Sequence, residues 1–269
     1  MERSQRRKRL PMILAAQLSD THFDLSPRNT ERVERVMAYL ADLPRRPDVI
    51  LVTGDITDSG KPEQYAEARL ALRADIPIHL LPGNHDDRAA FRTELLGEPT
   101  SDAPINSVHR VGRLTVIMLD STVPGEPGGL LAGETCDWLD ETVAAAGDGP
   151  IVVALHHPPR PVASPVVDVI ALAEPGRLAE VVAGDPRIIG VLTGHAHSPI
   201  ATTFAGKPMI TCPSTASVLG GEWEVTPPHK VMDYAPDPAV ALHVIDETNT
   251  LTTHFRSVPM GGWLAEPPI

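Results

Sequence analysis

The stretch DVILVTGD, residues 48–55, is a short apolar run that ends abruptly in Gly54 and Asp55. Its Val and Ile residues favour a buried β-strand, and its polar end marks the point at which such a strand stops. Five other runs along the chain have the same form. They are MILAAQLSD (12–20), IHLLPGNHD (78–86), LTVIMLDS (114–121), IVVALHHPP (151–159) and IIGVLTGHAH (188–197).

Helical patterns separate these runs. Between the first two, Ser26 is expected to cap a helix that begins at Pro27, because proline is favoured in the first helical turn. The apolar residues of that helix recur with helical spacing at Val33, Val36, Met37 and Leu40. Further helices are predicted from Pro62 to about Leu72, over 134–147 and over 176–184, the last two with a glycine near the C-terminal end. The alternation predicts an α/β sheet flanked by helices.

The C-terminal part of the chain has a different pattern. KPMITCPS (207–214), AVALHVID (239–246) and TLTTHFRSV (250–258) are strand candidates without helices between them. We therefore expect them to form a second, more antiparallel sheet, packed against the first as a sandwich with helices outside. Residues 220–238 are predicted to be a long loop or lid.

Composition bounds the possible functions. The chain has 269 residues, which fits one large domain, and a formal net charge of −12. That charge argues against non-specific binding to nucleic acid and against an anionic membrane surface. With only Cys136 and Cys212, a disulfide framework is not expected, and a reducing, cytoplasmic setting is predicted.

The N-terminus carries four consecutive basic residues before an apolar run, as a secretory signal does. Cleavage after that run would remove the first strand, so we predict a disordered basic leader over 1–11 and a single domain over 12–269. No apolar stretch reaches the roughly 18 residues that a membrane span requires.

Polar residues of metal-ligand type end five of the six main strand candidates. Open α/β sheets place their sites at the carboxyl ends of strands, so we expect these side chains to gather at one edge of one sheet. Asp20 and His22, and likewise His195 and His197, are two residues apart and point to the same side of an extended backbone. His156 and His157 alternate to opposite faces, so that at most one of them readily enters the site.

Imidazole and carboxylate ligands without thiolate suit Mn, Fe, Zn or Co rather than a structural zinc site. The chain offers more ligands than one ion needs. Two ions that share a bridging carboxylate are therefore the economical prediction.

These motifs together resemble those of the calcineurin-like metallophosphoesterase superfamily. Within it, the chain is similar to class III cyclic-nucleotide phosphodiesterases and, more closely, to bacterial glycerophosphodiester phosphodiesterases. The segments SGKPEQYAEAR, LPGNHDDRAAF and ALHHPPRP resemble the sequences of the latter group around the shared motifs. The resemblance covers roughly residues 12–215 and implies a four-layer α/β/β/α sandwich of two mixed sheets. It implies one metal held by Asp20, His22, Asp55 and His197, and a second held by Asp55, Asn84, His156 and His195.

At two positions the chain differs from other groups of the superfamily, and these differences narrow the choice of subfamily. Purple acid phosphatases carry a tyrosine ligand three residues after the bridging aspartate, where this chain has Asp58. Protein Ser/Thr phosphatases have an arginine where this chain has Ser59. Neither activity is favoured.

The function that the resemblance implies is hydrolysis of small phosphodiesters, either glycerophosphodiesters or 3′,5′-cyclic nucleotides, by metal-activated hydroxide. The alternatives are a phosphomonoesterase or nuclease of the same superfamily, or a scaffold module without the chemistry. The complete set of implied ligands disfavours the scaffold module, and the negative net charge of the protein disfavours the nuclease. The family also implies a homo-oligomer, with the C-terminal strands as a possible contact.

His85 follows the ligand Asn84 but alternates away from it, so we expect His85 to stabilise the phosphoryl group and to assist the leaving oxygen. Asp86 is expected to orient His85. Arg88 and Arg160 lie near the motifs but could equally be solvated surface charges.

Overall fold

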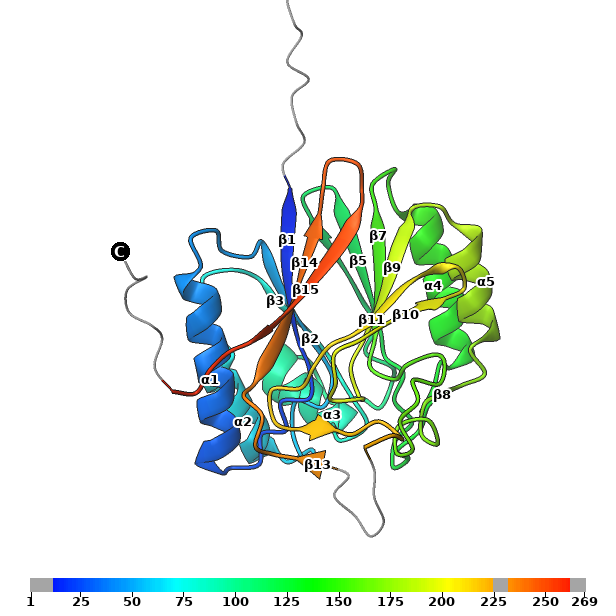
Figure 1. Ribbon diagram of the computed structural model, residues 1–269. Helices are drawn as coiled ribbons and strands as arrows, with labels where there is room; N and C mark the ends of the chain where they lie inside the picture. The colour runs from blue at the N-terminus through cyan, green and yellow to red at the C-terminus, as the bar shows by residue number, and fades with distance from the viewer. Residues whose placement is uncertain (1–11, 225–231, 262–269) are drawn as a thin grey trace, which may run out of the picture.

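Two β-sheets lie face to face in the computed structural model, which describes residues 12–224 and 232–261, and helices cover the outer face of each sheet (Figure 1). The predicted four-layer α/β/β/α sandwich is confirmed. The predicted leader, 1–11, and residues 225–231 of the predicted lid lie outside the described residues.

The first sheet has the strand order β15-β14-β1-β2-β3. Its parallel part consists of β1 (Ile13–Leu18), β2 (Val49–Thr53) and β3 (Ile78–Leu81). A C-terminal hairpin, β14 (Ala239–Ile245) and β15 (Leu251–Ser257), adds two antiparallel strands beside β1.

The second sheet has the order β10-β11-β9-β7-β5-β4. Four strands run parallel: β5 (Leu114–Leu119), β7 (Ile151–Leu155), β9 (Ile188–Thr193) and β11 (Lys207–Thr211). The edges are antiparallel strands, β4 (Ser107–Val111) and β10 (Ile200–Phe204).

Helices α1 (Pro27–Asp42) and α2 (Pro62–Ala71) lie beside the first sheet, and α4 (Gly133–Ala145) and α5 (Gly176–Gly184) lie beside the second (Figure 1). The predicted helix starts at Pro27 and Pro62 are confirmed. The Ser26 side chain makes no capping bond to α1 and donates to Asp24 instead. None of the described helices is long and apolar enough to cross a membrane.

Shorter elements join these layers. Helix α3 (Arg88–Phe91) continues into the π-helix η1 (Arg92–Leu96). Two small strand pairs complete the described part of the chain. They are β6 (Gly129–Leu130) with β8 (Leu172–Ala173), and β12 (Val218–Leu219) with β13 (Met232–Asp233).

The pleat of the central strands builds two apolar layers at once. In β2, Ile50 and Val52 belong to the cluster packed under α1 and α2, whereas Val49 and Leu51 face the second sheet. All four are buried, and burial of each such side chain contributes about 1.5–3 kcal/mol. A strand that is apolar on both faces is therefore required in this position, as the continuous run 48–55 indicated.

The predicted division of strands between the sheets is wrong. The six main strands do not share one sheet, because β1 to β3 lie in the first and β5, β7 and β9 in the second. The C-terminal strands form no sheet of their own, since β11 extends the second sheet beside β9 while β14 pairs with the free side of β1. Such pairing gives hydrogen-bond partners to the backbone at the edge of a strand. Residue patterns alone do not show which strands pair in this way.

His79 on β3 and His109 on β4 form a stacked pair across the two sheets, with ring centroids 3.5 Å apart. Burial lowers the pKa of His79, and burial together with the neighbouring His79 lowers the pKa of His109 to about 4. Both rings are therefore neutral in the folded protein near neutral pH.

This pair should make stability depend on pH. An unfolded histidine takes up its proton near pH 6.5, before the folded His109 does, so the free energy of unfolding should fall as the pH drops from about 6.5 to about 4. We expect His109→Gln to show a smaller fall than the parent over that window in urea unfolding. Equal slopes for the two proteins would contradict this account.

Candidate active site

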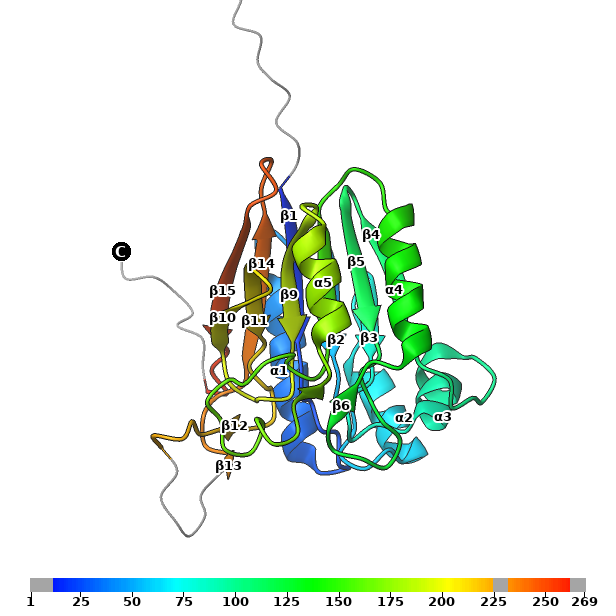
Figure 2. The same ribbon diagram turned by 90° about the vertical axis from the view of Figure 1, so that its right-hand side faces the viewer.

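The carboxyl ends of β1, β2, β3, β7 and β9 lie at one end of the sandwich, where loops from both sheets meet (Figures 1 and 2). The site was expected at one edge of one sheet, and it is instead shared between two. The structure brings all the predicted ligands together there. They are Asp20 and His22 after β1, Asp55 after β2, Asn84 after β3, His156 after β7, and His195 and His197 after β9.

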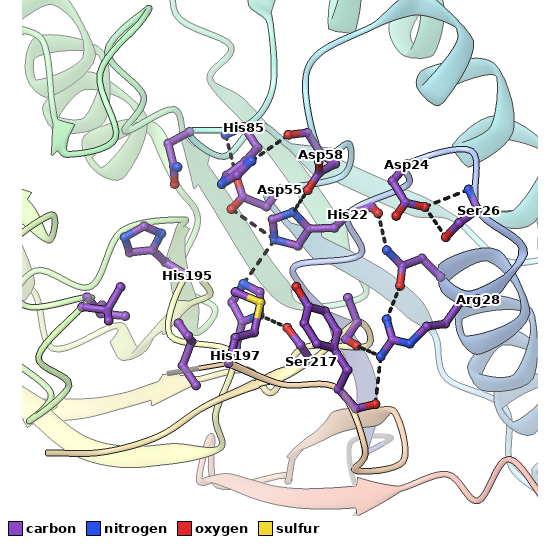
Figure 3. A pocket seen from close by; sticks show the side chains of 18 of the residues that line it. His22, Asp24, Ser26, Arg28, Asp55, Asp58, His85, His195, His197 and Ser217 are labelled. Carbon is purple, nitrogen blue, oxygen red and sulfur yellow. Dashed lines mark hydrogen bonds and ion pairs between the residues drawn. The ribbon is translucent and has the colours of Figure 1, made fainter. Parts of the chain in front are cut away.

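One group of side chains surrounds the ring of His22 (Figure 3). His22 Nε2 lies 3.2 Å from His197 Nε2 and 3.6 Å from Asp55 Oδ2. His197 Nε2 lies 3.5 Å from Asp20 Oδ1. The four ligand atoms of Asp20, His22, Asp55 and His197 all lie within 4.8 Å of one another, and all four residues are buried.

A second group surrounds the ring of His156. Its Nε2 lies 3.2 Å from Asn84 Oδ1, 3.2 Å from His195 Nδ1 and 3.4 Å from Asp55 Oδ2. Asp55 Oδ2 thus approaches both groups. The Asn84 side chain places a neutral oxygen in this group, at a position where the resemblance implies a ligand.

These contacts fit metal ligation better than hydrogen bonding. Donor atoms that bind one ion at about 2.0–2.2 Å lie roughly 3–3.5 Å from one another, which matches the spacings in both groups. In addition, His195 Nε2 is buried and has no hydrogen-bond partner in the described part of the chain. The His195 nitrogen that lies in the second group is Nδ1, so Nε2 can carry the proton of the ring and leave the lone pair of Nδ1 free for an ion.

The backbone is strained at the same residues. Asp20, His22, Asp55, His195 and His197 have φ angles of +53°, +43°, +49°, +68° and +52°. For residues with a side chain, each such conformation costs about 1–3 kcal/mol and persists only where the surroundings enforce it. These five are half of the ten described non-glycine residues with positive φ, and such residues cluster at functional sites.

Second contacts orient the rings. His156 Nδ1 donates to the carbonyl of Thr53 at 2.8 Å, and His197 Nδ1 lies 2.8 Å from Ser217 Oγ. His22 Nδ1 lies 3.4 Å from the Asp58 carboxylate. In each case Nε2 is left to face the centre of the group, which is how outer hydrogen bonds tune metal-binding histidines.

Buried charge dominates the electrostatics. Burial raises the pKa of Asp20 to about 6, although His156 partly counteracts this. Burial also acts on His156, but the Asp55 carboxylate more than offsets it and raises the pKa of His156 to about 9. Carboxylates enclosed in this way are stabilised by positive charge, which divalent ions supply.

His157 lies beside the second group, with a ring nitrogen within 4.8 Å of ring nitrogens of His156 and His195, but both of its own nitrogens have other partners. Its Nδ1 lies 2.8 Å from Ser121 Oγ, and its Nε2 lies 3.2 Å from the carbonyl of Pro127. Burial lowers its pKa well below the usual value, so the ring is neutral. Only one histidine of the pair faces the ligands, in agreement with the alternation in the sequence.

His85 lies at the exposed side of the ligands. Its backbone N–H donates to Asp55 Oδ1 at 2.9 Å, and its ring Nδ1 lies 2.8 Å from the carbonyl of Asp58. Because a carbonyl only accepts, Nδ1 carries the proton and Nε2 remains free to face a ligand.

The Asp86 carboxylate accepts from the backbone N–H groups of Ile56, Thr57 and Gly83 and from the Tyr65 hydroxyl. It makes no hydrogen bond to the His85 ring among the described residues. The contact expected of Asp86 is thus made by the Asp58 carbonyl, and Asp86 instead ties the loop after β2 to the loop after β3.

Arg88 is not the solvated charge that the sequence left open. Its Nε lies 2.8 Å from the carboxylate of Asp120, and the two side chains are 10% and 0% exposed. Arg160 is exposed and donates to the carbonyl of Thr203. Asp120 directly follows β5, so the polar residue after that strand forms an ion pair and does not belong to the two groups of predicted ligands.

A cavity of about 490 Å³ opens onto the predicted ligands. Its polar lining includes His22, Asp55 and His85 (Figure 3), and another part of its lining is apolar. The apolar side is formed by Val166, Val167, Ile170, Leu219, Met232 and the ring of Tyr234.

Two arginines one turn apart on α1 hold this wall. Arg28 Nη2 donates to the carbonyls of Ala216 and Tyr234, at 2.6 and 3.0 Å. Arg32 donates to the carbonyls of Thr215 and Pro236, both at 2.6 Å. Each arginine therefore bridges the two arms of the segment that carries β12 and β13.

These residues were missed because the partners lie more than 180 residues apart in the sequence. The only local signal was the i, i+4 spacing of two arginines on a helix. Ser217 and Asp58 likewise belong to no motif that the spacing of ligands reveals.

The family model for calcineurin-like phosphoesterases matches residues 14–199. The chain is 36% identical over 217 residues to a probable cyclic nucleotide phosphodiesterase of Rhodococcus erythropolis, which covers 76% of this chain and 71% of that protein. It is 31% identical over 273 residues to a glycerophosphodiester phosphodiesterase of Enterobacter lignolyticus, with 96% of each chain covered.

Solved structures share the fold at low sequence identity. A dimetal phosphatase from Danio rerio superposes with a TM-score of 0.63 and 14% identity, over 92% of this chain and 99% of that one. A purple acid phosphatase from yellow lupin gives a TM-score of 0.65 and 12% identity, over 92% of this chain and 52% of that one.

The close approach of Gly83 to the ligands makes it a sensitive position. A Cβ there would lie 2.2 Å from Asp55 Oδ1 and 2.3 Å from the Asp55 backbone nitrogen. We expect Gly83→Ala to displace Asp55 and to leave the purified protein with less than its full metal content, measured by elemental analysis. Gly133→Ala is the matched control, since a Cβ at that position meets nothing within 4 Å. Full metal content in Gly83→Ala would contradict the assignment of Asp55.

Proposed function

Since the chain belongs to the calcineurin-like phosphoesterase family, we propose that it is a metal-dependent phosphodiesterase whose two ligand groups hold two divalent ions and whose cavity binds small phosphodiesters. The substrates are glycerophosphodiesters or 3′,5′-cyclic nucleotides. Both kinds of activity appear in the names of the relatives, and both are hydrolyses of a diester.

The observation that carries the proposal is the shared carboxylate of Asp55. Its Oδ2 lies 3.6 Å from His22 Nε2 and 3.4 Å from His156 Nε2. A carboxylate between two sets of imidazole ligands suits a pair of ions that it bridges. We assign the first ion to Asp20, His22, Asp55 and His197, and the second to Asp55, Asn84, His156 and His195.

The donor set also bounds the metals. Imidazole, carboxylate and amide ligands without thiolate suit Mn, Fe, Zn or Co, and availability selects among them. The first ion has two carboxylates and the second only one, with a neutral amide in place of the other. The second site thus has less negative charge, and we expect it to lose its metal more easily.

Bound divalent ions would supply a strong nucleophile near neutral pH and neutralise charge on the phosphoryl group. The protein's own residues position the substrate. His85 lines the cavity, and the Asp58 carbonyl fixes its tautomer, which leaves Nε2 as the ring nitrogen free to meet a substrate. A protonated His85 can donate a hydrogen bond to a phosphoryl oxygen and then a proton to the leaving alcohol oxygen, which is otherwise a poor leaving group.

The charge of the cavity favours a diester over a monoester. Arg28 is the one arginine or lysine among the described lining residues, and its guanidinium already donates to Asn29 and to two carbonyls. A phosphodiester carries a single negative charge and needs less compensation than a monoester does. An oligomeric assembly and a cytoplasmic location remain predictions from the sequence.

A substrate panel tests the proposal. We expect Mn²⁺-dependent hydrolysis of bis-p-nitrophenyl phosphate and of glycerophosphoethanolamine or cAMP, with slower hydrolysis of p-nitrophenyl phosphate. Faster turnover of the monoester would favour the phosphomonoesterase. No metal-dependent turnover of any diester would sink the proposal.

Two neighbouring variants should separate metal binding from proton transfer. Asn84→Ala removes an oxygen ligand, so it should lower the affinity for the second metal. His85→Ala should retain both metals and lower kcat by about 10²–10⁴-fold on glycerophosphodiesters. The loss should be smaller on p-nitrophenyl esters, because p-nitrophenolate leaves without a proton. If His85→Ala empties a metal site, the division of roles is wrong.

A further inference from the structure

A second cavity, of about 210 Å³, adjoins the site on the other side of Asn84 and His85. These two residues line both cavities, and the two cavities have no other described lining residue in common. The smaller cavity is formed by the loops that follow β2, β3 and β5, together with the start of α3 and the segment after η1. Its further lining includes Ser59, Asp87, Arg88, Asp102, Thr122 and Val123.

We propose that this smaller cavity binds one alcohol arm of an open-chain phosphodiester, specifically a small alcohol rich in hydrogen-bond donors such as glycerol or ethanolamine. The larger cavity takes the other arm. The inference rests on the proposed function, because it requires the phosphodiester phosphorus to lie beside Asn84 and His85.

Size supports this division. A glycerol unit occupies about the volume of four water molecules, roughly 120 Å³, and fits within the smaller cavity. A nucleoside with its base is larger and fits only the 490 Å³ cavity, whose apolar wall suits a bulky arm. The two cavities therefore accept different arms.

Charge supports it as well. Arg88, the only arginine or lysine among the described residues that line the smaller cavity, is paired with the buried Asp120 and donates to the carbonyls of Asp102 and Thr122. The carboxylates of Asp87 and Asp102 leave the cavity acidic. An acidic cavity repels a second anionic group and favours hydroxyl or ammonium donors.

Asp87 is positioned to accept from such donors. One of its oxygens, Oδ1, accepts from the Ala90 backbone N–H at 2.8 Å and caps α3. The other oxygen has no partner within residues 12–224 and 232–261. Ser59 Oγ donates to Gln64 and keeps its lone pairs for a further donor.

The arrangement distinguishes the two substrate classes. In a 3′,5′-cyclic nucleotide both ester oxygens belong to one ring, so both arms lead to the same nucleoside and only one cavity can be used. An open-chain diester has two independent alcohols and uses both. The smaller cavity thus favours open-chain diesters with a small polar arm.

Three esters of p-nitrophenyl phosphate test the proposal, with glycerol, ethanolamine or methanol as the second alcohol. They share a leaving group that needs no proton and differ only in the small arm. We expect kcat/KM of the Mn²⁺-loaded enzyme to be at least tenfold higher for the glycerol and ethanolamine esters than for the methyl ester.

Two variants locate the preference. Val123→Trp should fill the smaller cavity and reduce the tenfold preference to about unity. Asp87→Asn keeps a helix-capping oxygen but removes the charge, so it should weaken the ethanolamine ester more than the glycerol ester. Val169→Trp is the control, because Val169 is 80% exposed and lines neither cavity.

The outcomes are distinct. A methyl ester as good as the glycerol ester in the parent, or a preference that survives both Val123→Trp and Asp87→Asn in folded, metal-loaded protein, would overturn the inference. Absence of metal-dependent p-nitrophenol release from all three esters would instead contradict the proposed function, and the inference with it.

Discussion

The carboxylate of Asp55 is the contact on which the rest of the site depends. It is 2% exposed, lies between the rings of His22 and His156, and accepts the backbone N–H of His85 at 2.9 Å. Burial of a carboxylate is costly, yet its pKa lies well below the usual value, because burial is outweighed by His156 and His22. One side chain thus links the loops after β1, β2, β3 and β7.

This convergence follows from the way in which the two sheets are oriented. The parallel strands of both sheets end on the same side of the sandwich, so a loop from either sheet reaches the same space (Figure 1). Gly54 and Gly194 leave room for that approach. A Cβ on Gly54 would lie 2.3 Å from His156 Nδ1, and one on Gly194 would lie 2.0 Å from Ser19 Oγ. The glycines next to the ligands are therefore required for packing between the sheets.

Much of the fold and site could be predicted from the sequence because the relevant signals are local. Each of the strands before the site is a continuous apolar run, and each of the seven predicted ligands lies among the first few residues after such a run. Sheet membership could not be predicted, since β1 and β7 have the same local pattern and differ only in their pairing partners. Asp86 was also misjudged, because adjacency to His85 in the chain does not determine which backbone N–H groups a carboxylate meets.

The residues that no pattern revealed act at long range. Ser217 meets His197 through the return of the chain after β11, and Arg32 meets Thr215 across 183 residues. Such contacts form only in the completed fold, and no repeat or residue spacing in the sequence indicates them. These residues contact the predicted ligands or the cavity wall: Ser217 orients the ring of His197, and Arg32 holds the segment that forms the wall.

The hydrogen bonds between α1 and the β12–β13 segment have an evolutionary consequence. Arg28 and Arg32 donate their hydrogen bonds to main-chain carbonyls of that segment, so these bonds do not depend on the side chains that the segment carries. Tyr234 differs from the rest of the wall, because the Arg28 guanidinium also lies 4.6 Å from the centroid of its ring. The wall can consequently exchange its other apolar side chains while its hydrogen bonds to α1 are kept. Selection can thus alter the choice of substrate in this segment without touching the residues that perform the chemistry.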